Sequence, residues 1–191
     1  MTENGSWTHE EFEKLHQNCP EDLKVLVLIA YYLPMRQTEI LNLTWQEIDL
    51  KMGFIRLGGD RTKNKIGRNI PLHPRIIESL QSCSRPIHGG CVFSESRRYN
   101  RKAYNKAVKA ADIVDFNFHD LRHCAINNMR LAGNDHFVIK QASGAKTDSA
   151  FQRYNLVTEE EMKSIKWLDE KGEKSGTIDT YMDTIAKTKI V

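Results

Sequence analysis

Apolar residues along this chain recur mainly at helical spacing, three or four positions apart. Thr8, followed three residues later by Glu11, forms a capping-box signature that predicts a helix running to about Asn18. Pro20 begins a second predicted helix over residues 21–33, and the second half of this helix is apolar on nearly all sides. A helix without a polar face is buried, so this segment is predicted to form the centre of the core.

The rest of the chain also favours helices, apart from one region of alternating pattern. Residues 54–57 and 69–72, separated by turn residues, indicate a small antiparallel sheet within residues 53–72. The tip of this hairpin carries Lys63 and Lys65. Further elements are expected as helices at residues 36–43, 74–82, 98–111, 120–132, 136–142, 147–155 and 159–168, with a short strand at 91–93. The predicted fold class is therefore α+β, mainly α-helical.

The composition is that of an ordinary globular protein of one domain. Of its 191 residues, 28% are charged and 40% are hydrophobic, and the formal net charge is +3. The longest apolar run, residues 25–33, is much shorter than the roughly 20 residues that a membrane-spanning helix needs. No secretion signal is visible, and the four cysteines form no CxxC pair. Secreted, membrane and zinc-finger classes are therefore disfavoured, and we expect an intracellular protein with reduced thiols.

Positive charge is concentrated in one segment of the chain. Residues 158–191 carry a net charge of −2, so residues 1–157 carry +5. Residues 97–111 contain no acidic residue, and Tyr99 and Tyr104 lie among six cations. The cations are Arg97, Arg98, Arg101, Lys102, Lys106 and Lys109. A charge run of this kind is often only the solvated face of a helix. Interleaved with aromatic residues, it also suits the phosphates of a nucleic acid.

The segment His119-Asp120-Leu121-Arg122-His123 is open to three interpretations. Two histidines four positions apart on a helix can share a metal, but Arg122 would lie beside the ion and no third ligand stands at a known spacing. Asp120 as a helix-start residue, with the histidines as ordinary polar neighbours, is the plain structural explanation. A helix N-terminus that also offers Arg122 and a histidine is a ready site for an anion.

Three further candidates each have an ordinary structural explanation as well. Arg36 follows a buried helix, where a cation needs a partner, and Glu39 three residues later supplies one. Lys63 lies at a hairpin tip, where lysine often discourages aggregation but could equally enter a groove of DNA. Tyr154 lies on a short predicted helix with apolar neighbours, where a tyrosine is usually part of the core. Taken singly, none of these residues decides the function.

Taken in order, four segments resemble the catalytic domain of the tyrosine recombinases, also called phage integrases. They are MRQTEILNLTWQEIDL at residues 35–50, TKNKIGRNIPL at 62–72, HDLRH at 119–123 and GAKTDSAFQRYN at 144–155. The resemblance implies a helical bundle with a small antiparallel sheet. It also implies site-specific recombination or integration of DNA, in which strands are cleaved and rejoined through a covalent 3′-phosphotyrosyl intermediate.

The resemblance gives a role to each of five catalytic residues: Arg36, Lys63, His119, Arg122 and Tyr154. The phenol of Tyr154 would attack the scissile phosphorus and form the covalent intermediate. Arg36 and Arg122 would hold the non-bridging oxygens, and Lys63 would protonate the leaving 5′-oxygen. His119 would assist proton transfer near the nucleophile. Because arginines supply the positive charge, no metal or other cofactor is required.

Other residues would support this chemistry or bind the DNA. Glu39 would orient Arg36, while Asp120 and His123 would support the catalytic groups from behind. Phosphate contacts position a protein on its DNA, and they come from basic side chains. The expected contacts with double-stranded DNA are Lys65, Arg68, Arg97, Arg98, Arg101, Lys102 and Lys106.

One position departs from the family pattern. The family usually has histidine or tryptophan directly after the glycine of the last segment, whereas this chain has Ala145, which cannot donate a hydrogen bond to the phosphate. Losing one such donor typically costs about 10²–10³ in rate. The chain could be a weakened enzyme, a natural variant in which Lys146 substitutes, or an engineered or decayed copy. We favour DNA binding with reduced cleavage; the alternative is a weakened DNA-binding module that regulates or partners active integrases.

The expected organisation is a catalytic domain over residues 1–170 and a C-terminal tail over residues 171–191 that docks in cis or in trans. The N-terminal core-binding domain that family members generally carry is expected to be absent. We expect a monomer in isolation, a tetramer on DNA when full-length, no membrane partner, and a bacterial or phage-encoded protein of the cytoplasm, associated with the nucleoid. A metal-dependent hydrolase using His119 and His123 and a topoisomerase-like activity are the remaining alternatives.

Overall fold

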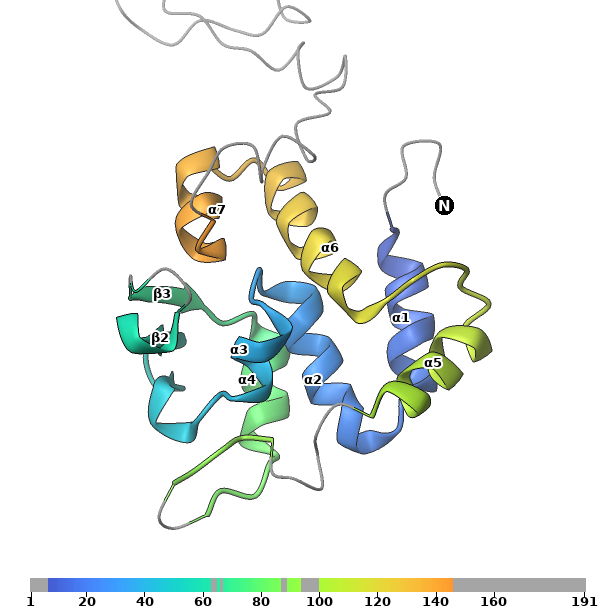
Figure 1. The fold of residues 1–191 in the computed structure, drawn as a ribbon, viewed down its shortest axis with the longest axis horizontal. Coiled ribbons are helices and arrows are strands. Elements are labelled where there is room, and N and C mark those ends of the chain that lie inside the picture. The colour runs from blue at the N-terminus through green and yellow to red at the C-terminus, as the bar shows by residue number, and fades with distance from the viewer. Residues whose placement is uncertain (1–6, 63–64, 66, 87–88, 94–99, 146–191) are drawn as a thin grey trace, which may run out of the picture. The chain divides into compact units, whose positions relative to one another are not determined.

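Figure 1 shows how the elements of the chain are arranged. The computed structural model describes residues 7–62, 65, 67–86, 89–93 and 100–145. They belong to the first of two compact units, residues 1–150, and the second unit comprises residues 151–191. The helices predicted at residues 147–155 and 159–168 lie outside the described residues.

The described chain is mainly helical, with one small sheet. The helices are α1 (His9–Asn18), α2 (Glu21–Tyr32), α3 (Gln37–Leu41), α4 (Pro74–Gln81), α5 (Arg101–Ala110), α6 (Phe118–Leu131) and α7 (His136–Ser143). The strands are β1 (Ile48–Asp49), β2 (Phe54–Leu57) and β3 (Arg68–Pro71), and short 3-10 helices lie at Trp45–Glu47 and Gly59–Arg61. The predicted fold class, mainly helical with a small antiparallel sheet, is confirmed. No described helix is both long enough and apolar enough to cross a membrane.

Local hydrogen bonds determine where α1 begins. The Thr8 hydroxyl accepts a hydrogen bond from the backbone nitrogen of Glu11 at 3.2 Å. The Glu11 carboxylate in return accepts one from the Thr8 nitrogen at 2.8 Å, so the predicted capping box is confirmed. Pro20 directly precedes α2, as predicted, and is its N-cap residue in an extended conformation, with a φ of −63° and a ψ of 154°.

The helix that carries the HDLRH segment begins two residues earlier than its pattern predicts. α6 starts at Phe118 because the side chain of Asn117 accepts a hydrogen bond from the nitrogen of His119 at 3.0 Å. Asp120 completes this cap by accepting one from the Asn117 nitrogen at 2.8 Å. Asp120 is therefore a first-turn residue, as its position near the helix start suggests, but it does not begin the helix.

Two other boundaries also differ from those that the pattern predicts. α5 begins at Arg101 rather than at residue 98, because the side chain of Asn100 accepts a hydrogen bond from a first-turn backbone nitrogen at 3.1 Å. The strand expected near Cys91 is reduced to a single antiparallel bridge with Thr44. Two backbone hydrogen bonds flank this bridge: Trp45 donates to the Gly90 carbonyl at 3.0 Å, and Val92 donates to the Leu43 carbonyl at 2.8 Å.

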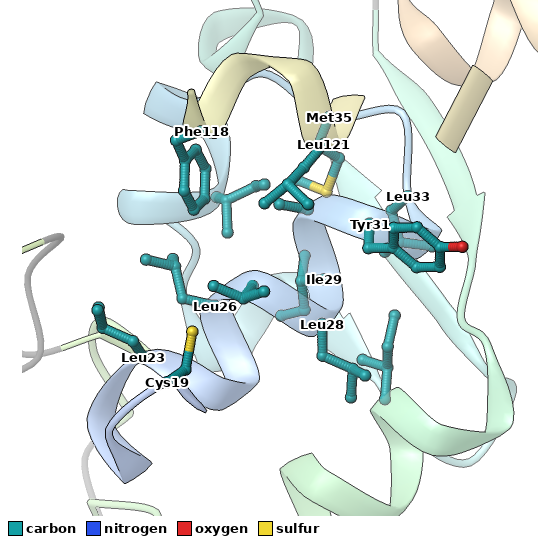
Figure 2. Close-up of a cluster of buried hydrophobic side chains, with 14 of the residues drawn as sticks. Cys19, Leu23, Leu26, Leu28, Ile29, Tyr31, Leu33, Met35, Phe118 and Leu121 are labelled. Atoms are coloured by element: carbon teal, nitrogen blue, oxygen red, sulfur yellow. The ribbon is translucent and has the colours of Figure 1, made fainter. Parts of the chain in front are cut away.

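α2 lies at the centre of the core, as its apolar sequence predicts. It packs against α1, α3, α4 and α6. Figure 2 shows Leu23, Leu26 and Ile29 of α2 in one buried cluster with Phe118 and Leu121 of α6. Removing each such side chain from water contributes about 1.5–3 kcal/mol. This packing fixes α6, and with it the HDLRH segment, against the centre of the core.

The three strands form one antiparallel sheet in the order β1-β2-β3. Ile55 of β2 pairs with Ile70 of β3, and both side chains are fully buried. Because strand side chains alternate between faces, Arg68 shares the inward face of β3 with Ile70. β3 packs against α7, which brings this arginine to the helix. The sequence pattern does not predict β1, since two residues are too few to show an alternation.

Candidate functional site

Three arginines from different elements meet at the C-terminal end of α7. The backbone carbonyls of residues 142–144 accept one hydrogen bond each, from Arg68 Nε at 2.9 Å, Arg122 Nη2 at 3.0 Å and Arg36 Nη2 at 3.0 Å, in that order. The last carbonyls of a helix have no partner within the helix and form the negative end of its dipole. The end of α7 therefore attracts three guanidinium groups and holds them close together.

One carboxylate, that of Glu39 in α3, joins two of these arginines. It accepts hydrogen bonds from Arg36 Nη1 at 3.0 Å, from Arg68 Nη2 at 2.7 Å, and from the backbone nitrogen of Arg36 at 2.7 Å. Burial alone would raise the pKa of Glu39, but the hydrogen bonds from Arg68 and from the Arg36 backbone outweigh burial and lower it. The carboxylate is therefore ionised at neutral pH, and the Arg36–Glu39 pair expected from the spacing is present.

Arg122 of α6 is the third cation and is held by backbone carbonyls. It donates hydrogen bonds to the carbonyl oxygens of Pro34 and Ser143. Burial lowers the pKa of its guanidinium to about 10, and the positive charges of Arg36 and Arg68 act in the same direction. The group is still protonated at neutral pH. Three guanidinium groups around one carboxylate leave an excess of positive charge, which suits an anion such as a phosphate.

We call Arg36, Glu39, Arg68 and Arg122 the arginine cluster. Its members differ in how far they reach the surface: the side chain of Arg36 is 27% exposed, whereas that of Arg68 is 2% exposed. Arg36 owes its position to the start of α3, where it is the cap residue and its backbone nitrogen is bound by Glu39. A phosphate arriving from solvent would therefore meet Arg36 before it met Arg68.

The position of Arg68 differs from the expectation that it contacts DNA. Its guanidinium is buried and is bound to Glu39 and to the carbonyl of Ala142. The reason is the register of β3, which turns Arg68 to the same inward face as Ile70. A signal for this was present in the sequence, because an arginine two residues before an apolar strand position lies on the buried side and must find a partner there.

The histidines of the HDLRH segment lie in the first two turns of α6. Their rings meet edge to face, with centroids 4.9 Å apart, and His119 is exposed while His123 is half-buried. His119 and Arg122, three positions apart, project from neighbouring positions on the helix. Among the residues that the structure describes, no three His, Cys, Asp or Glu side chains are grouped as a metal ion would require.

The last segment of the site is described only at its beginning. Gly144 ends α7 with a left-handed φ of +64°, and Ala145 follows, its nitrogen donating to the Ser143 hydroxyl at 3.3 Å. The methyl side chain of Ala145 offers no hydrogen-bond donor. The candidates that lie outside the described residues, and whose placement stays a prediction, are Lys63, Arg97, Arg98, Lys146 and Tyr154.

The described cations of the basic segment, at residues 101, 102, 106 and 109, are exposed on α5. Tyr104 does not share this exposure: it is fully buried, with its ring 5.5 Å from that of Phe118. The expected interleaving of cations and aromatic residues therefore fails at this position, because the tyrosine belongs to the side of the helix that packs on the core. The described cations expected to contact DNA are exposed, apart from Arg68: Lys65, Arg101, Lys102 and Lys106.

The fold and the arginine cluster define a class of protein: a mainly helical domain that gathers guanidinium groups for an anion. Residues 6–161 match the phage integrase family, and the chain belongs to that family. The matched residues include all four members of the arginine cluster and extend beyond Tyr154. The resemblance drawn from the four sequence segments is confirmed.

Comparison with individual proteins gives the same result. The chain is 35% identical over 133 residues to the shufflon-specific DNA recombinase of Escherichia coli. This alignment covers 69% of this chain but only 34% of the length of that recombinase. The catalytic domain of bacteriophage HP1 integrase aligns with a TM-score of 0.65 at 20% identity, covering 83% of this chain and 91% of that domain. A lambda integrase dimer bound to a COC′ core site aligns with a TM-score of 0.60 at 22% identity, over 78% of this chain and 59% of that one. These structures confirm the integrase catalytic fold.

Proposed function

We propose that this chain forms the catalytic part of a site-specific recombinase that cleaves and rejoins double-stranded DNA through a covalent 3′-phosphotyrosyl intermediate. The observation that carries the proposal is the arginine cluster, in which two guanidinium groups share the Glu39 carboxylate and a third, that of Arg122, is held beside them by the carbonyl of Ser143. A phosphodiester gathers negative charge on its non-bridging oxygens in the transition state, and fixed guanidinium groups stabilise that charge. The proposed nucleophile is Tyr154, in the last of the four segments that resemble the family.

The reaction proceeds in two transfers of one phosphoryl group. The phenol oxygen of Tyr154 attacks the scissile phosphorus, and the 5′-oxygen leaves with a proton from Lys63. Arg36 and Arg122 hold the non-bridging oxygens, and His119 assists proton transfer near the phenol. The reverse transfer, from tyrosine to a second 5′-hydroxyl, rejoins the strands. The intermediate conserves the energy of the phosphodiester bond, so neither a nucleotide nor a metal is required.

The partner that this reaction needs is double-stranded DNA. The exposed cations of α5 supply contacts with the phosphate backbone that do not depend on sequence. The lambda integrase structure, in which a dimer is bound to a core site, supports this assignment for a relative of similar fold. We propose that residues 1–170 form the catalytic domain, with residues 171–191 as a docking tail. On DNA, full-length protomers would assemble as a tetramer.

A suicide substrate tests the proposal. The purified chain is incubated with a library of duplexes that carry candidate core sites, each with a phosphorothiolate at the scissile position, so that the leaving strand cannot religate. A protein–DNA adduct that survives denaturation is expected, and Tyr154→Phe should abolish it while leaving DNA binding unchanged. Absence of an adduct from every site, both in the natural chain and in Ala145→His, would contradict the proposal.

A second candidate function, a DNA-binding module with weakened catalysis, is favoured by one observation. Ala145 follows the end of α7 beside the arginine cluster, and its side chain is a methyl group without a donor. If the site lacks one donor, Ala145→His should raise the single-turnover cleavage rate by about 10²-fold. A natural chain that cleaves as fast as Ala145→His would exclude the weakened module. A natural chain that binds DNA without cleaving it, together with an Ala145→His variant that does cleave, would support the weakened module.

A further inference from the structure

Arg68 connects three elements of the site through one buried side chain. It projects from β3, donates from Nη2 to the Glu39 carboxylate of α3 at 2.7 Å, and donates from Nε to the carbonyl of Ala142 in α7 at 2.9 Å. Only 2% of its side chain is exposed. A buried guanidinium is costly unless its charge is paired and its donors are bound, and here one carboxylate and one helix-end carbonyl satisfy both needs.

Arg68 and Arg36 share one partner, the Glu39 carboxylate, and their other partners are carbonyls of the same helix end. The same Glu39 carboxylate binds Arg36 at its side chain and its backbone nitrogen, and Arg36 also binds the carbonyl of Gly144, two residues beyond Ala142. The position of Arg36 is therefore defined by two anchors: Arg68 binds the first, Glu39, directly, and binds the chain two residues before the second, Gly144. A shift of Arg68 would be transmitted to both.

The backbone at Gly144 is fitted closely against Arg68. A Cβ atom at residue 144 would lie 2.8 Å from Arg68 Nη1, and the φ of +64° at this residue already favours glycine. The guanidinium thus packs against the turn that ends α7, as well as bonding to the carbonyl before it. This contact sets the path on which the chain leaves α7 toward Ala145.

We propose that Arg68 is a positioning residue, which fixes Arg36 and the carbonyl row of residues 142–144 without touching DNA. The inference rests on the proposed function, since it assigns to Arg68 an effect on the cleavage step. It replaces the DNA contact expected from the sequence. Its chemical basis is geometric: a planar guanidinium donates along two directions at once, to Glu39 and to Ala142, whereas a single ammonium head group does not bridge both at this spacing.

Single-turnover kinetics of Arg68→Met, at saturating suicide substrate, separate positioning from simple stabilisation. The rate constant for adduct formation should fall by about 10–100-fold, because small misplacements of a catalytic group have effects of that size. The dissociation constant for DNA and the active fraction should change less than twofold. A fall in the active fraction alone, with an unchanged rate constant, would show that Arg68 only stabilises the fold and would overturn the inference.

Arg75→Met is the matched control. Arg75 is also bound to a carboxylate, that of Glu13, and to a tyrosine hydroxyl, but it takes no part in the arginine cluster. Its replacement should leave the rate constant unchanged. If Arg68→Met fails to fold, Arg68→Lys, which keeps the charge, replaces it and should still be slowed. A wild-type rate in Arg68→Lys would overturn the inference, since charge alone would then suffice.

Nitrogen-15 NMR of the arginine side chains tests the inference independently of cleavage. In the natural chain the Arg36 guanidinium signals should be resolved by restricted rotation, and Arg36→Lys identifies them. They should average in Arg68→Met and stay resolved in Arg75→Met. Unchanged Arg36 signals in Arg68→Met would overturn the inference. A natural chain that shows the expected signals but forms no adduct would instead contradict the proposed function and leave the positioning role standing.

Discussion

Two of the places where the chain pairs arginine with glutamate have opposite electrostatic results. We call Glu13 of α1 and Arg75 of α4 the Glu13 clamp. In the clamp one arginine binds one carboxylate, with Arg75 Nη2 3.2 Å from Glu13 Oε2, and Arg75 also donates to the hydroxyl of Tyr32 at 3.1 Å. The arginine cluster has three guanidinium groups to one carboxylate: two bind Glu39, and the third, Arg122, binds backbone carbonyls. The clamp is neutral and partly exposed, whereas the cluster is positive and contains the buried pair of Arg68 and Glu39.

The pKa shifts follow this difference. In the clamp the hydrogen bond from Arg75 lowers the pKa of Glu13, and the hydrogen bond to Glu13 raises the pKa of Arg75, so each partner favours the charge of the other. In the cluster burial and neighbouring cations lower the pKa of Arg122 to about 10. A cation whose charge is disfavoured by its surroundings gains from an incoming anion. The ratio of arginine to carboxylate therefore separates a structural clamp from an anion site.

The test with the largest expected effect removes the carboxylate charge from the cluster and, separately, from the clamp. Glu39→Gln leaves the buried Arg68 and the partly exposed Arg36 without a counter-charge and should lower the free energy of unfolding by about 3–5 kcal/mol. Glu13→Gln, at a pair whose side chains are 28% and 36% exposed, should lower it by about 0–1 kcal/mol. Urea unfolding measures both values. Equal losses in the two variants would break the distinction between cluster and clamp.

A second test adds one methyl group beside the cluster. Gly144→Ala and Gly133→Ala both place alanine at a left-handed φ, of +64° and +79°, which costs about 1–2 kcal/mol. At Gly133 the added Cβ meets nothing within 4 Å, whereas at Gly144 it lies 2.8 Å from Arg68 Nη1. Overpacking there should cost about 1–3 kcal/mol more. Thermal unfolding of the two variants gives the difference, and equal melting temperatures would argue against close packing at the cluster.

A third test uses pH. The pKa of Glu39 is lower in the folded chain than its ordinary value of 4.5, so the unfolded chain takes up the proton first as the pH falls. The stabilisation from this carboxylate is complete well above pH 4.5 and is lost as the pH falls through the folded pKa. The gap in unfolding free energy between the natural chain and Glu39→Gln should therefore narrow between pH 7 and pH 3. A gap that stays constant over this range would contradict the paired state of Glu39.

The smallest expected effect concerns a cation that belongs to neither the cluster nor the clamp. Lys106 is exposed on α5, whereas Arg75 is bound in the clamp. Lys106→Gln should reduce the slope of log affinity for duplex DNA against log salt concentration by about 0.9, as expected for the loss of one phosphate contact. Arg75→Gln should leave this slope unchanged. Fluorescence anisotropy over a range of salt concentrations measures both, and equal slopes in the two variants would show that Lys106 contacts no phosphate.

The elements that sequence reasoning predicted well are those determined by neighbouring residues. The start of α1 follows from Thr8 and Glu11, three positions apart, and the burial of α2 follows from its own apolar sequence. The sequence pattern places the start of α6 two residues too late, because Asn117, and not Asp120, caps the helix. β1 offers only two residues, and its strand character comes from pairing with β2.

The candidate site shows the same division. The Arg36–Glu39 pair lies within three residues and was expected from spacing alone. Arg68 binds partners 29 and 74 positions away in the sequence, so no local pattern could reveal them. Only its inward position on β3 pointed to burial. Tyr104 likewise lies among cations in the sequence, which suggests a shared contact with phosphates, but its side of α5 packs on the core.

The carbonyl row at the end of α7 also bears on how this site can change over time. Three arginines are anchored there to peptide oxygens, and a peptide oxygen is present whatever side chain a residue carries. Point mutations at Ala142 and Ser143 thus leave the anchors in place. An insertion or deletion within α7 would rotate all three oxygens away from the guanidinium groups at once. The site is accordingly tolerant of substitution and intolerant of a change in helix length.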